Sequence, residues 1–173
     1  MRELVIDDCT PGEGKTLGAL MVAVYSSLPG FPSPAEQPRY YDMLANIRNL
    51  AERPGARVLV ARMNGEVAGG VVYLGDMAHY GSGGTAGSRR NASGIRLLAV
   101  DPEWRGHGIG KALTEFCIEL ARKAGHREVV LHTTATMQTA WKMYEGLGFR
   151  RDEELDFMQE ALPVYGFSLP LGS

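Results

Sequence analysis

A glycine-rich turn between a buried strand and an amphipathic helix most restricts how this chain of 173 residues can fold. The turn spans residues 105–111 and reads RGHGIGK. Before it, residues 95–100 are apolar except for Arg96 and predict a buried strand. After it, apolar residues recur at steps of three and four, which predicts a helix over 109–124. A strand that passes through a short turn into a helix is typical of α/β folds.

The same turn has the properties of an anion-binding site. The first N–H groups of a helix lack intrahelical partners, and the helix dipole adds partial positive charge there. Glycines let an anion approach those amides closely, and Arg105 and Lys111 can neutralise further negative charge. The simpler alternative is a glycine-rich turn with solvated charges. A dinucleotide-binding fingerprint does not fit this turn. It requires a third glycine where this chain has Lys111, and an acidic residue near the end of the next strand, where this chain has His132 and Thr133.

A second glycine-rich segment, residues 12–16, reads GEGKT and follows a predicted strand. It looks like the end of a P-loop, a motif that also needs a glycine five residues before Gly14. That position is Cys9 in this chain. The sequence therefore favours an ordinary capped helix start, with a nucleotide site at Lys15 as the alternative.

Hydrophobic periodicity and turn residues predict the order β-α-α-β-β-β-α-β-α-β-β over a single domain spanning residues 1–173. This order predicts an α/β fold with a mixed sheet rather than a regularly alternating one. The loop 75–93 is rich in glycine and serine and is predicted to lack regular secondary structure. The predicted strands are 3–7, 57–63, 66–74, 95–100, 128–133, 149–158 and 162–169, and the predicted helices are 12–26, 40–51, 109–124 and 136–147.

Composition excludes several classes of protein. The chain is 45% hydrophobic and 22% charged, with a formal net charge of −2, which argues against a general binder of nucleic acid or anionic membranes. The two cysteines, Cys9 and Cys117, are too few for a disulfide framework or a multi-cysteine metal site. No segment resembles a signal peptide or a membrane span, so a cytoplasmic protein is expected.

The segment 97–110 resembles the GNAT superfamily of N-acetyltransferases, and the resemblance continues to the end of the chain. The family's pyrophosphate loop, [RQ]-x-x-G-x-[GA], is matched by Arg105, Gly108 and Gly110. A second family pattern, an alanine followed by a tyrosine and a Gly-Phe pair, is matched by Ala140, Tyr144, Gly148 and Phe149. Two patterns at the family's separation make the resemblance specific.

The resemblance implies a strongly twisted mixed sheet flanked by helices, whose fourth and fifth strands splay apart around acetyl-CoA. The main chain of Leu98, Ala99 and Val100 would pair with the pantetheine arm. The pyrophosphate would be held by the loop residues Arg105, Gly106, His107, Gly108, Ile109, Gly110 and Lys111. Many members have an asparagine seven residues before the tyrosine. Here that residue is Met137, so the contact either moves to Thr133 or Thr134 or is absent.

The resemblance places Tyr144 where many members protonate the departing CoA thiolate. The alternative for Tyr144 is a core tyrosine with a bonded hydroxyl. Many members also carry a glutamate base near the start of the fourth strand, but residues 93–96 contain no acid. His132 is the candidate base because imidazole titrates in the right range. Its alternative is a strand histidine bonded to backbone or solvent.

By resemblance, the chain is an N-acetyltransferase that moves an acetyl group from acetyl-CoA to a primary amine by direct attack in a ternary complex. A non-catalytic acyl-CoA-binding module is the alternative, which the missing glutamate keeps open. The acceptor pocket is expected from residues 28–38, 75–93 and the C-terminal hairpin, none of which carries a diagnostic motif. Family members often dimerise, so a homodimer is compatible with the resemblance, whereas nucleic acid and membrane partners are not expected.

Overall fold

The strands and helices follow one another along the chain in nearly the predicted order. The computed structural model describes residues 3–172. The elements are β1 (Leu4–Asp8), α1 (Gly14–Ser26), α2 (Pro38–Ala45), β2 (Ala56–Met63), β3 (Glu66–Leu74), β4 (Ala92–Val100), α3 (Ile109–Lys123), β5 (Glu128–Thr133), α4 (Gln138–Gly146), β6 (Arg150–Arg151), β7 (Phe157–Gln159) and β8 (Leu162–Pro170). Short 3₁₀ turns connect them, among them η2 (Ile47–Glu52), η3 (Met77–His79), η4 (Ala86–Ser88) and η6 (Glu153–Leu155).

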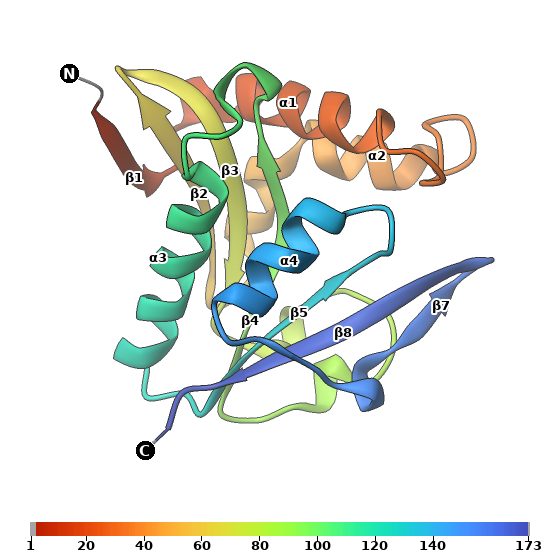
Figure 1. Cartoon of the computed structure of the whole chain (residues 1–173). Coiled ribbons are helices and arrows are strands. Elements are labelled where there is room, and N and C mark those ends of the chain that lie inside the picture. The colour runs from red at the N-terminus through yellow and green to blue at the C-terminus, as the bar shows by residue number, and fades with distance from the viewer. Residues whose placement is uncertain (1–2, 173) are drawn as a thin grey trace.

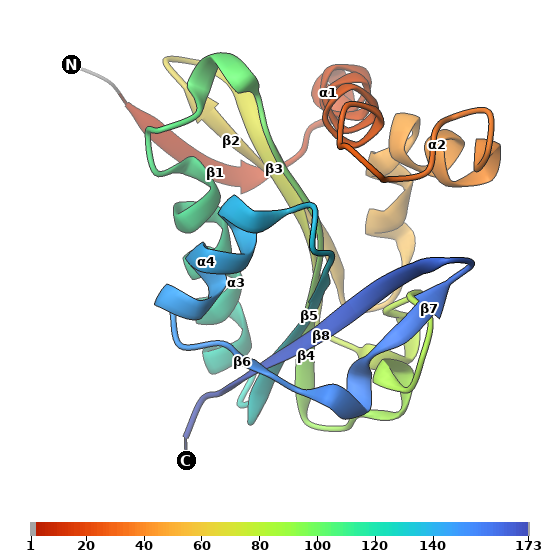
Figure 2. The same cartoon turned by 45° about the vertical axis from the view of Figure 1, so that its right-hand side comes forward.

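The strands form a mixed, twisted sheet in the order β1-β2-β3-β4-β5-β8-β6, with β7 paired to β8 (Figure 1). Strands β4 and β5 are parallel, whereas the other pairs are antiparallel. Helices α1 and α2 cover one face of the sheet, and α3 and α4 cover the other (Figure 2). The α/β class and the mixed sheet flanked by helices are therefore confirmed. No helix within residues 3–172 has the length and apolar content needed to cross a bilayer.

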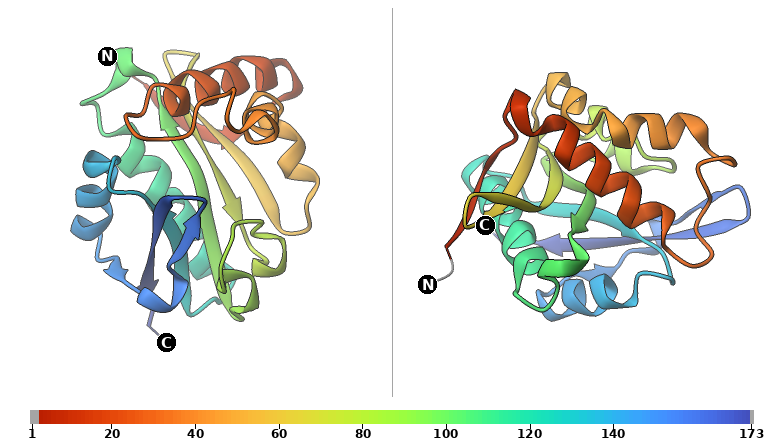
Figure 3. Two further views of the ribbon diagram at one scale, coloured as in Figure 1. Left: turned by 90° about the vertical axis from the view of Figure 1, so that its right-hand side faces the viewer. Right: turned by 90° about the horizontal axis from the view of Figure 1, so that it is seen from above.

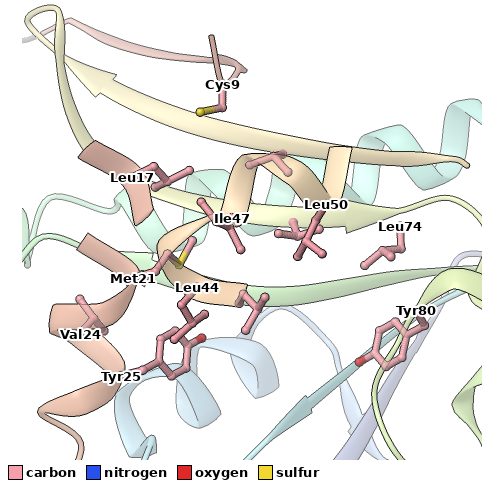
Figure 4. Packing of buried hydrophobic residues seen from close by; sticks show 14 of the residues in the cluster. Cys9, Leu17, Met21, Val24, Tyr25, Leu44, Ile47, Leu50, Leu74 and Tyr80 are labelled. Carbon is pink, nitrogen blue, oxygen red and sulfur yellow. The ribbon is translucent and has the colours of Figure 1, made fainter. Parts of the chain in front are cut away.

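The core has two parts because both faces of the central strands are buried. Along β2, Val58 and Val60 pack toward α1 and α2, while Leu59 and Ala61 pack toward α3. This alternation follows from the two-residue period of a strand. On the α1 side, a row of α1 side chains faces the residues of α2 and η2, as Figure 4 shows for Leu17, Met21, Val24, Tyr25, Leu44, Ile47 and Leu50.

Strands β4 and β5 separate halfway along their length. Their parallel pairing runs from Ala92 opposite Glu128 to Ile95 opposite Leu131, and it ends there although both strands continue. At the same point the register between β3 and β4 shifts, and Leu97 adopts a φ of +59°. A bulge of this kind bends a strand away from its neighbour. The splayed fourth and fifth strands implied by the family resemblance are confirmed.

Two predicted elements are interrupted. The strand predicted over 149–158 is broken into β6 and β7 by η6, because Asp156 turns inward to bond Arg151 at 2.7 Å and the Gly166 amide at 2.7 Å. The helix predicted over 40–51 ends at Ala45 and continues as η2, where the Asn46 side-chain amide donates to the Asp42 carbonyl. At Asn46 a side-chain bond to a local backbone group competes with the helix, whereas the partners of Asp156 lie on β6 and β8.

The loop predicted over 75–93 is more ordered than expected. It contains η3 and η4, and its last two residues begin β4. Met77, Tyr80 and Ala86 are buried, so the loop is anchored by its own apolar side chains. It lies beside the β7–β8 hairpin, and Figure 3 shows the two together at one end of the sheet. The Thr85 hydroxyl donates to the Glu154 carbonyl and joins them.

We expect Gly18→Ala to destabilise the protein, although this exchange usually stabilises a helix by up to ~1 kcal/mol. A Cβ on Gly18 would collide with the backbone carbonyl of Ala45, where α1 and α2 cross. Forced overpacking of this kind costs about 1–3 kcal/mol. Urea denaturation followed by circular dichroism measures the change in the free energy of unfolding.

The matched control is Gly146→Ala at the end of α4, where nothing lies within 4 Å of the added Cβ. This variant should be neutral or slightly more stable than the parent. Equal stability changes in the two variants would contradict the close crossing of α1 and α2.

Candidate active site

A cavity of about 520 Å³ opens where β4 and β5 separate. Its walls come from α1, the end of β4, the turn 105–111, the first turn of α3 and helix α4. The glycine-rich turn and the separated edge of β4 therefore border one cavity. The sequence predicted both features, but only the fold joins them.

The turn presents a helix N-terminus to this cavity. Gly106 and Gly108 have φ angles of +82° and +76°, a conformation that other residues adopt only with strain. Helix α3 begins at Ile109, and no side chain caps it. Its first amides are therefore free to bind an anion, and Arg105 and Lys111 line the same end of the cavity. The geometry and charge suit a pyrophosphate.

His107 supports this turn from the outside. Its Nδ1 lies 3.1 Å from the carbonyl oxygens of Trp104 and Arg105, so this nitrogen carries the proton and donates. The imidazole side chain is exposed and does not line the cavity. Only the backbone of His107 remains suited to the phosphate role that the resemblance implied.

The edge of β4 forms one long wall through Leu98, Ala99 and Val100. The hydroxyl of Tyr25 in α1 donates to the Leu98 carbonyl at 2.9 Å. This carbonyl therefore already has a partner at the edge that would pair with a pantetheine arm. Local sequence patterns do not indicate this contact, because they identify Tyr25 only as a residue of an amphipathic helix.

A second, smaller cavity of about 110 Å³ lies on the other side of that wall. The two cavities share Tyr25, Leu98, Met137 and Ala140, so they are neighbours across a common boundary. Each of the three segments expected to form an acceptor pocket contributes to the second cavity. The residues from these segments are Phe31, Tyr80, Ser82, Phe157, Gln159 and Val164.

Tyr144 lines the second cavity from α4. Its side chain is only 5% exposed and packs edge-on against Phe149. Within residues 3–172 its hydroxyl makes no hydrogen bond, whereas those of the buried Tyr25, Tyr41, Tyr73 and Tyr80 each make one. No fully buried side-chain oxygen in this part of the chain lacks a partner, so the Tyr144 oxygen is open to the cavity. Burial raises the pKa of Tyr144 well above its usual value, so the hydroxyl keeps its proton at neutral pH.

His132 also lines the second cavity, but both of its ring nitrogens are occupied. Nε2 lies 2.8 Å from the Leu155 carbonyl and must donate to it. Nδ1 therefore carries the lone pair and accepts from the Tyr80 hydroxyl at 2.9 Å. Burial lowers the pKa of His132, and the Arg96 charge lowers it further. The base role of His132 stays a prediction, and these bonds limit it to a relay through Tyr80.

Thr133 faces the smaller cavity rather than the larger one. Its hydroxyl points to the Met137 sulfur at 3.5 Å, and Met137 lines both cavities. A pantetheine contact by Thr133 therefore stays a prediction. The threonines that line the larger cavity are Thr136 and Thr139, at the start of α4, and neither stood out in the sequence.

Neither cavity has a carboxylate among the described residues that line it. Asp156, between η6 and β7, is bound to Arg151 at 2.7 Å. Glu154 is exposed and lies 3.6 Å from Arg89. The acids of the closing strands therefore serve ion pairs outside the cavities, and a directly placed carboxylate base is missing from this part of the chain.

The P-loop-like segment folds as a capped helix start. Glu13 accepts from the Thr10 amide, and its carboxylate pairs with Arg62 at 2.6 Å, which lowers the Glu13 pKa to about 2. A negative charge therefore occupies the position where a phosphate would need positive charge. Lys15 is exposed and lines neither cavity. The arrangement gives no support to the nucleotide-site alternative.

Comparison with known proteins identifies the class. The model of the acetyltransferase (GNAT) family matches residues 21–149, which include the second half of α1, the glycine-rich turn and α4. The chain therefore belongs to the GNAT family of acetyltransferases.

Individual relatives agree with this assignment. N-acetylaspartate synthetase from Xenopus tropicalis is 34% identical over 99 residues, which are 57% of this chain and 32% of that protein. An acetyltransferase of the GNAT family from Staphylococcus aureus Mu50 superposes with a TM-score of 0.74 at 17% identity, covering 98% of this chain and 100% of the other. The acetyltransferase yncA from Salmonella typhimurium, solved with its cofactor acetyl-CoA, superposes with a TM-score of 0.67 at 18% identity, covering 99% and 95%.

The first curated relatives are much longer than the segments they share with this chain. The matched segments span only 23% and 32% of the first two, both of which are named N-acetylaspartate synthetase. The solved structures share less than 20% identity with this chain, so they bear on its fold alone.

Burial, together with the Arg96 charge, holds the pKa of His132 below the ordinary histidine value of about 6.5, although the bond to the Leu155 carbonyl acts in the opposite direction. The folded protein then binds fewer protons at this site than the unfolded chain, so stability falls as the pH drops below about 6.5. Nitrogen-correlated NMR of the imidazole should show the proton on Nε2 at neutral pH. A midpoint at or above 6.5, or a proton on Nδ1, would contradict the bonding described here.

Proposed function

We propose that this protein transfers an acetyl group from acetyl-CoA to an amine by direct attack. The observation that carries the proposal is the pair of adjoining cavities, one ending at the uncapped N-terminus of α3 and the other lined by Tyr144. The larger cavity takes the cofactor, with its pyrophosphate on the amides of the turn and its pantetheine arm along the edge of β4. Family membership supports the same assignment.

The acetyl group would lie at the boundary that both cavities share. There the amine nitrogen attacks the thioester carbonyl carbon, the C–S bond breaks, and the nitrogen loses one proton. The departing thiolate gains a proton from a donor, and the proton lost by the nitrogen replaces it, so that no proton is taken up or released overall. Tyr144 is the proposed donor, because its hydroxyl is protonated, lines the second cavity and has no partner among residues 3–172.

The amine must reach the thioester without its proton, since an ammonium ion has no lone pair. No carboxylate lines the cavities within the described chain, but Arg96 lines the smaller one. Burial and a neighbouring positive charge both lower the pKa of a bound ammonium group. The pocket therefore favours the neutral amine by its own electrostatics. His132 holds Tyr80 in place and would accept a proton only through that hydroxyl.

The missing carboxylate also favours a second candidate, a non-catalytic acyl-CoA-binding module. Thiol release separates the two, because only the enzyme produces free CoA when an amine is added. The proposal further includes one acetyl-CoA-binding domain over residues 1–173 and a cytoplasmic location, and it is compatible with a homodimer; these points rest on the sequence and the family resemblance.

Gly108→Val should weaken acetyl-CoA binding by at least about 1–3 kcal/mol. Valine is strained at the φ of +76°, and its side chain stands in front of the amides of α3. Isothermal titration calorimetry measures the affinity directly. The matched control is Gly125→Val, which has the same φ of +76° at the other end of α3.

The control should lose a similar amount of stability and keep its affinity for acetyl-CoA. Unchanged affinity in a folded Gly108→Val variant would refute the assigned pyrophosphate site.

Tyr144→Phe should lower kcat by about 10²–10⁴-fold, the usual contribution of a general acid, while acetyl-CoA affinity stays the same. Phenylalanine keeps the packing against Phe149 and removes only the proton. The loss should shrink with an acyl donor whose thiol is more acidic, because that leaving group needs less help.

The matched control is Tyr73→Phe, which removes a buried hydroxyl that bonds Ser93 at 2.7 Å and lines neither cavity. This variant should lose stability and keep kcat. If Tyr144→Phe retains kcat within about threefold, Tyr144 is a packing residue.

A further inference from the structure

Arg96 brings a positive charge into the smaller cavity, and no carboxylate within residues 3–172 pairs with it. It lies on β4 directly after the last residue that pairs with β5, where the strands separate. Its guanidinium lies over the Tyr80 ring, 5.8 Å from the ring centre, and Nη1 donates to the Tyr80 carbonyl at 3.1 Å. Within residues 3–172 no carboxylate lies within 4.0 Å of Arg96.

A second arginine, Arg53, lies close to Arg96 and adds to the positive charge there. Arg53 donates through Nη1 to the His79 carbonyl, one residue before the carbonyl that Arg96 uses. A Cβ placed on Gly81 would lie 2.5 Å from Nη1 of Arg53 and 3.3 Å from Nη1 of Arg96. Arg53, too, has no acidic partner within the described chain. Two like charges held together are unfavourable unless an anion joins them.

Other arginines of this protein show that acidic partners are available to the chain. Arg62, Arg89 and Arg151 each bond at least one carboxylate at 2.9 Å or less. Arg96, which lines the smaller cavity, and Arg53 beside it have no such partner within the described residues. An unpaired guanidinium that borders a cavity is suited to a ligand, since its flat fork matches a carboxylate.

The other residues that line the smaller cavity limit the size and polarity of such a ligand. Phe31, Tyr40 and Phe157 give the cavity apolar ring surfaces, and its volume of about 110 Å³ is near that of only a few water molecules. A small molecule, or the end of a longer one, fits this space.

We propose that the acceptor amine carries a carboxylate and that Arg96 binds it, as in a small amino acid. This inference rests on the proposed acetyl transfer and names the substrate class of the same site. The carboxylate lies against Arg96 on β4, while the amino group lies toward the boundary shared with the larger cavity. Arg53 adds a second positive charge behind Arg96 and acts as a positioning residue.

The test compares matched small amines that differ only by the α-carboxylate: alanine with ethylamine, serine with ethanolamine, and valine with isobutylamine. Their binding to the protein saturated with CoA is measured by calorimetry, which does not depend on turnover. At least one carboxylate-bearing amine should bind roughly tenfold to a hundredfold more tightly than its partner, as for a charge-assisted bond. Release of CoA from acetyl-CoA is then measured with the same compounds.

Arg96→Gln should abolish the preference for the carboxylate and leave the affinity for acetyl-CoA unchanged. Arg96→Lys should restore part of the preference, because the charge remains and the planar fork is lost. The matched control is Arg90→Gln, which removes an exposed arginine of the loop before β4 and should change nothing. Circular dichroism of each variant establishes that the fold is kept.

Equal binding of the paired amines, a preference that survives in Arg96→Gln, or no binding by any carboxylate-bearing amine would overturn the inference. A different result would overturn the proposed function alone: carboxylate-dependent binding in the parent protein without CoA release from acetyl-CoA.

Discussion

The end of hydrogen bonding between β4 and β5 is the constraint on which the rest of the site depends. Up to Ile95 and Leu131 the two strands share an ordinary parallel ladder. Beyond that point the bulge at Leu97 turns β4 away and leaves a strand edge beside open space. Both cavities lie along this opening. Without the bulge the ladder would continue and the space would close.

Both cavities have a positive electrostatic potential, which comes from different groups in each. In the larger cavity the positive potential comes from the helix N-terminus and from Arg105 and Lys111. In the smaller cavity it comes from Arg96, with Arg53 behind it. The whole chain has a formal net charge of −2. The positive regions are therefore local to the cleft, in keeping with small anionic ligands rather than polyanions.

The sequence predicted the parts of the site that depend on local chemistry. The turn 105–111 and its place between strand and helix follow from glycine geometry and periodicity, and Tyr144 stands in a family pattern. Tyr25 and Arg96 could not be predicted in the same way. Their importance comes from partners far along the chain, the Leu98 carbonyl for Tyr25 and the Tyr80 carbonyl for Arg96. The break at η6 escaped prediction for a similar reason, since Asp156 bonds Gly166 across a strand pair.

The residues that line the cleft differ in how freely they can be substituted, depending on whether they border one cavity or both. Tyr25, Leu98, Met137 and Ala140 border both cavities, so a new side chain at any of them alters cofactor and acceptor together. Residues such as Phe31, Ser82 and Gln159 border only the smaller cavity and lie outside the helices. A change of acceptor, whether by natural divergence or by engineering, therefore has its easiest route through these peripheral positions.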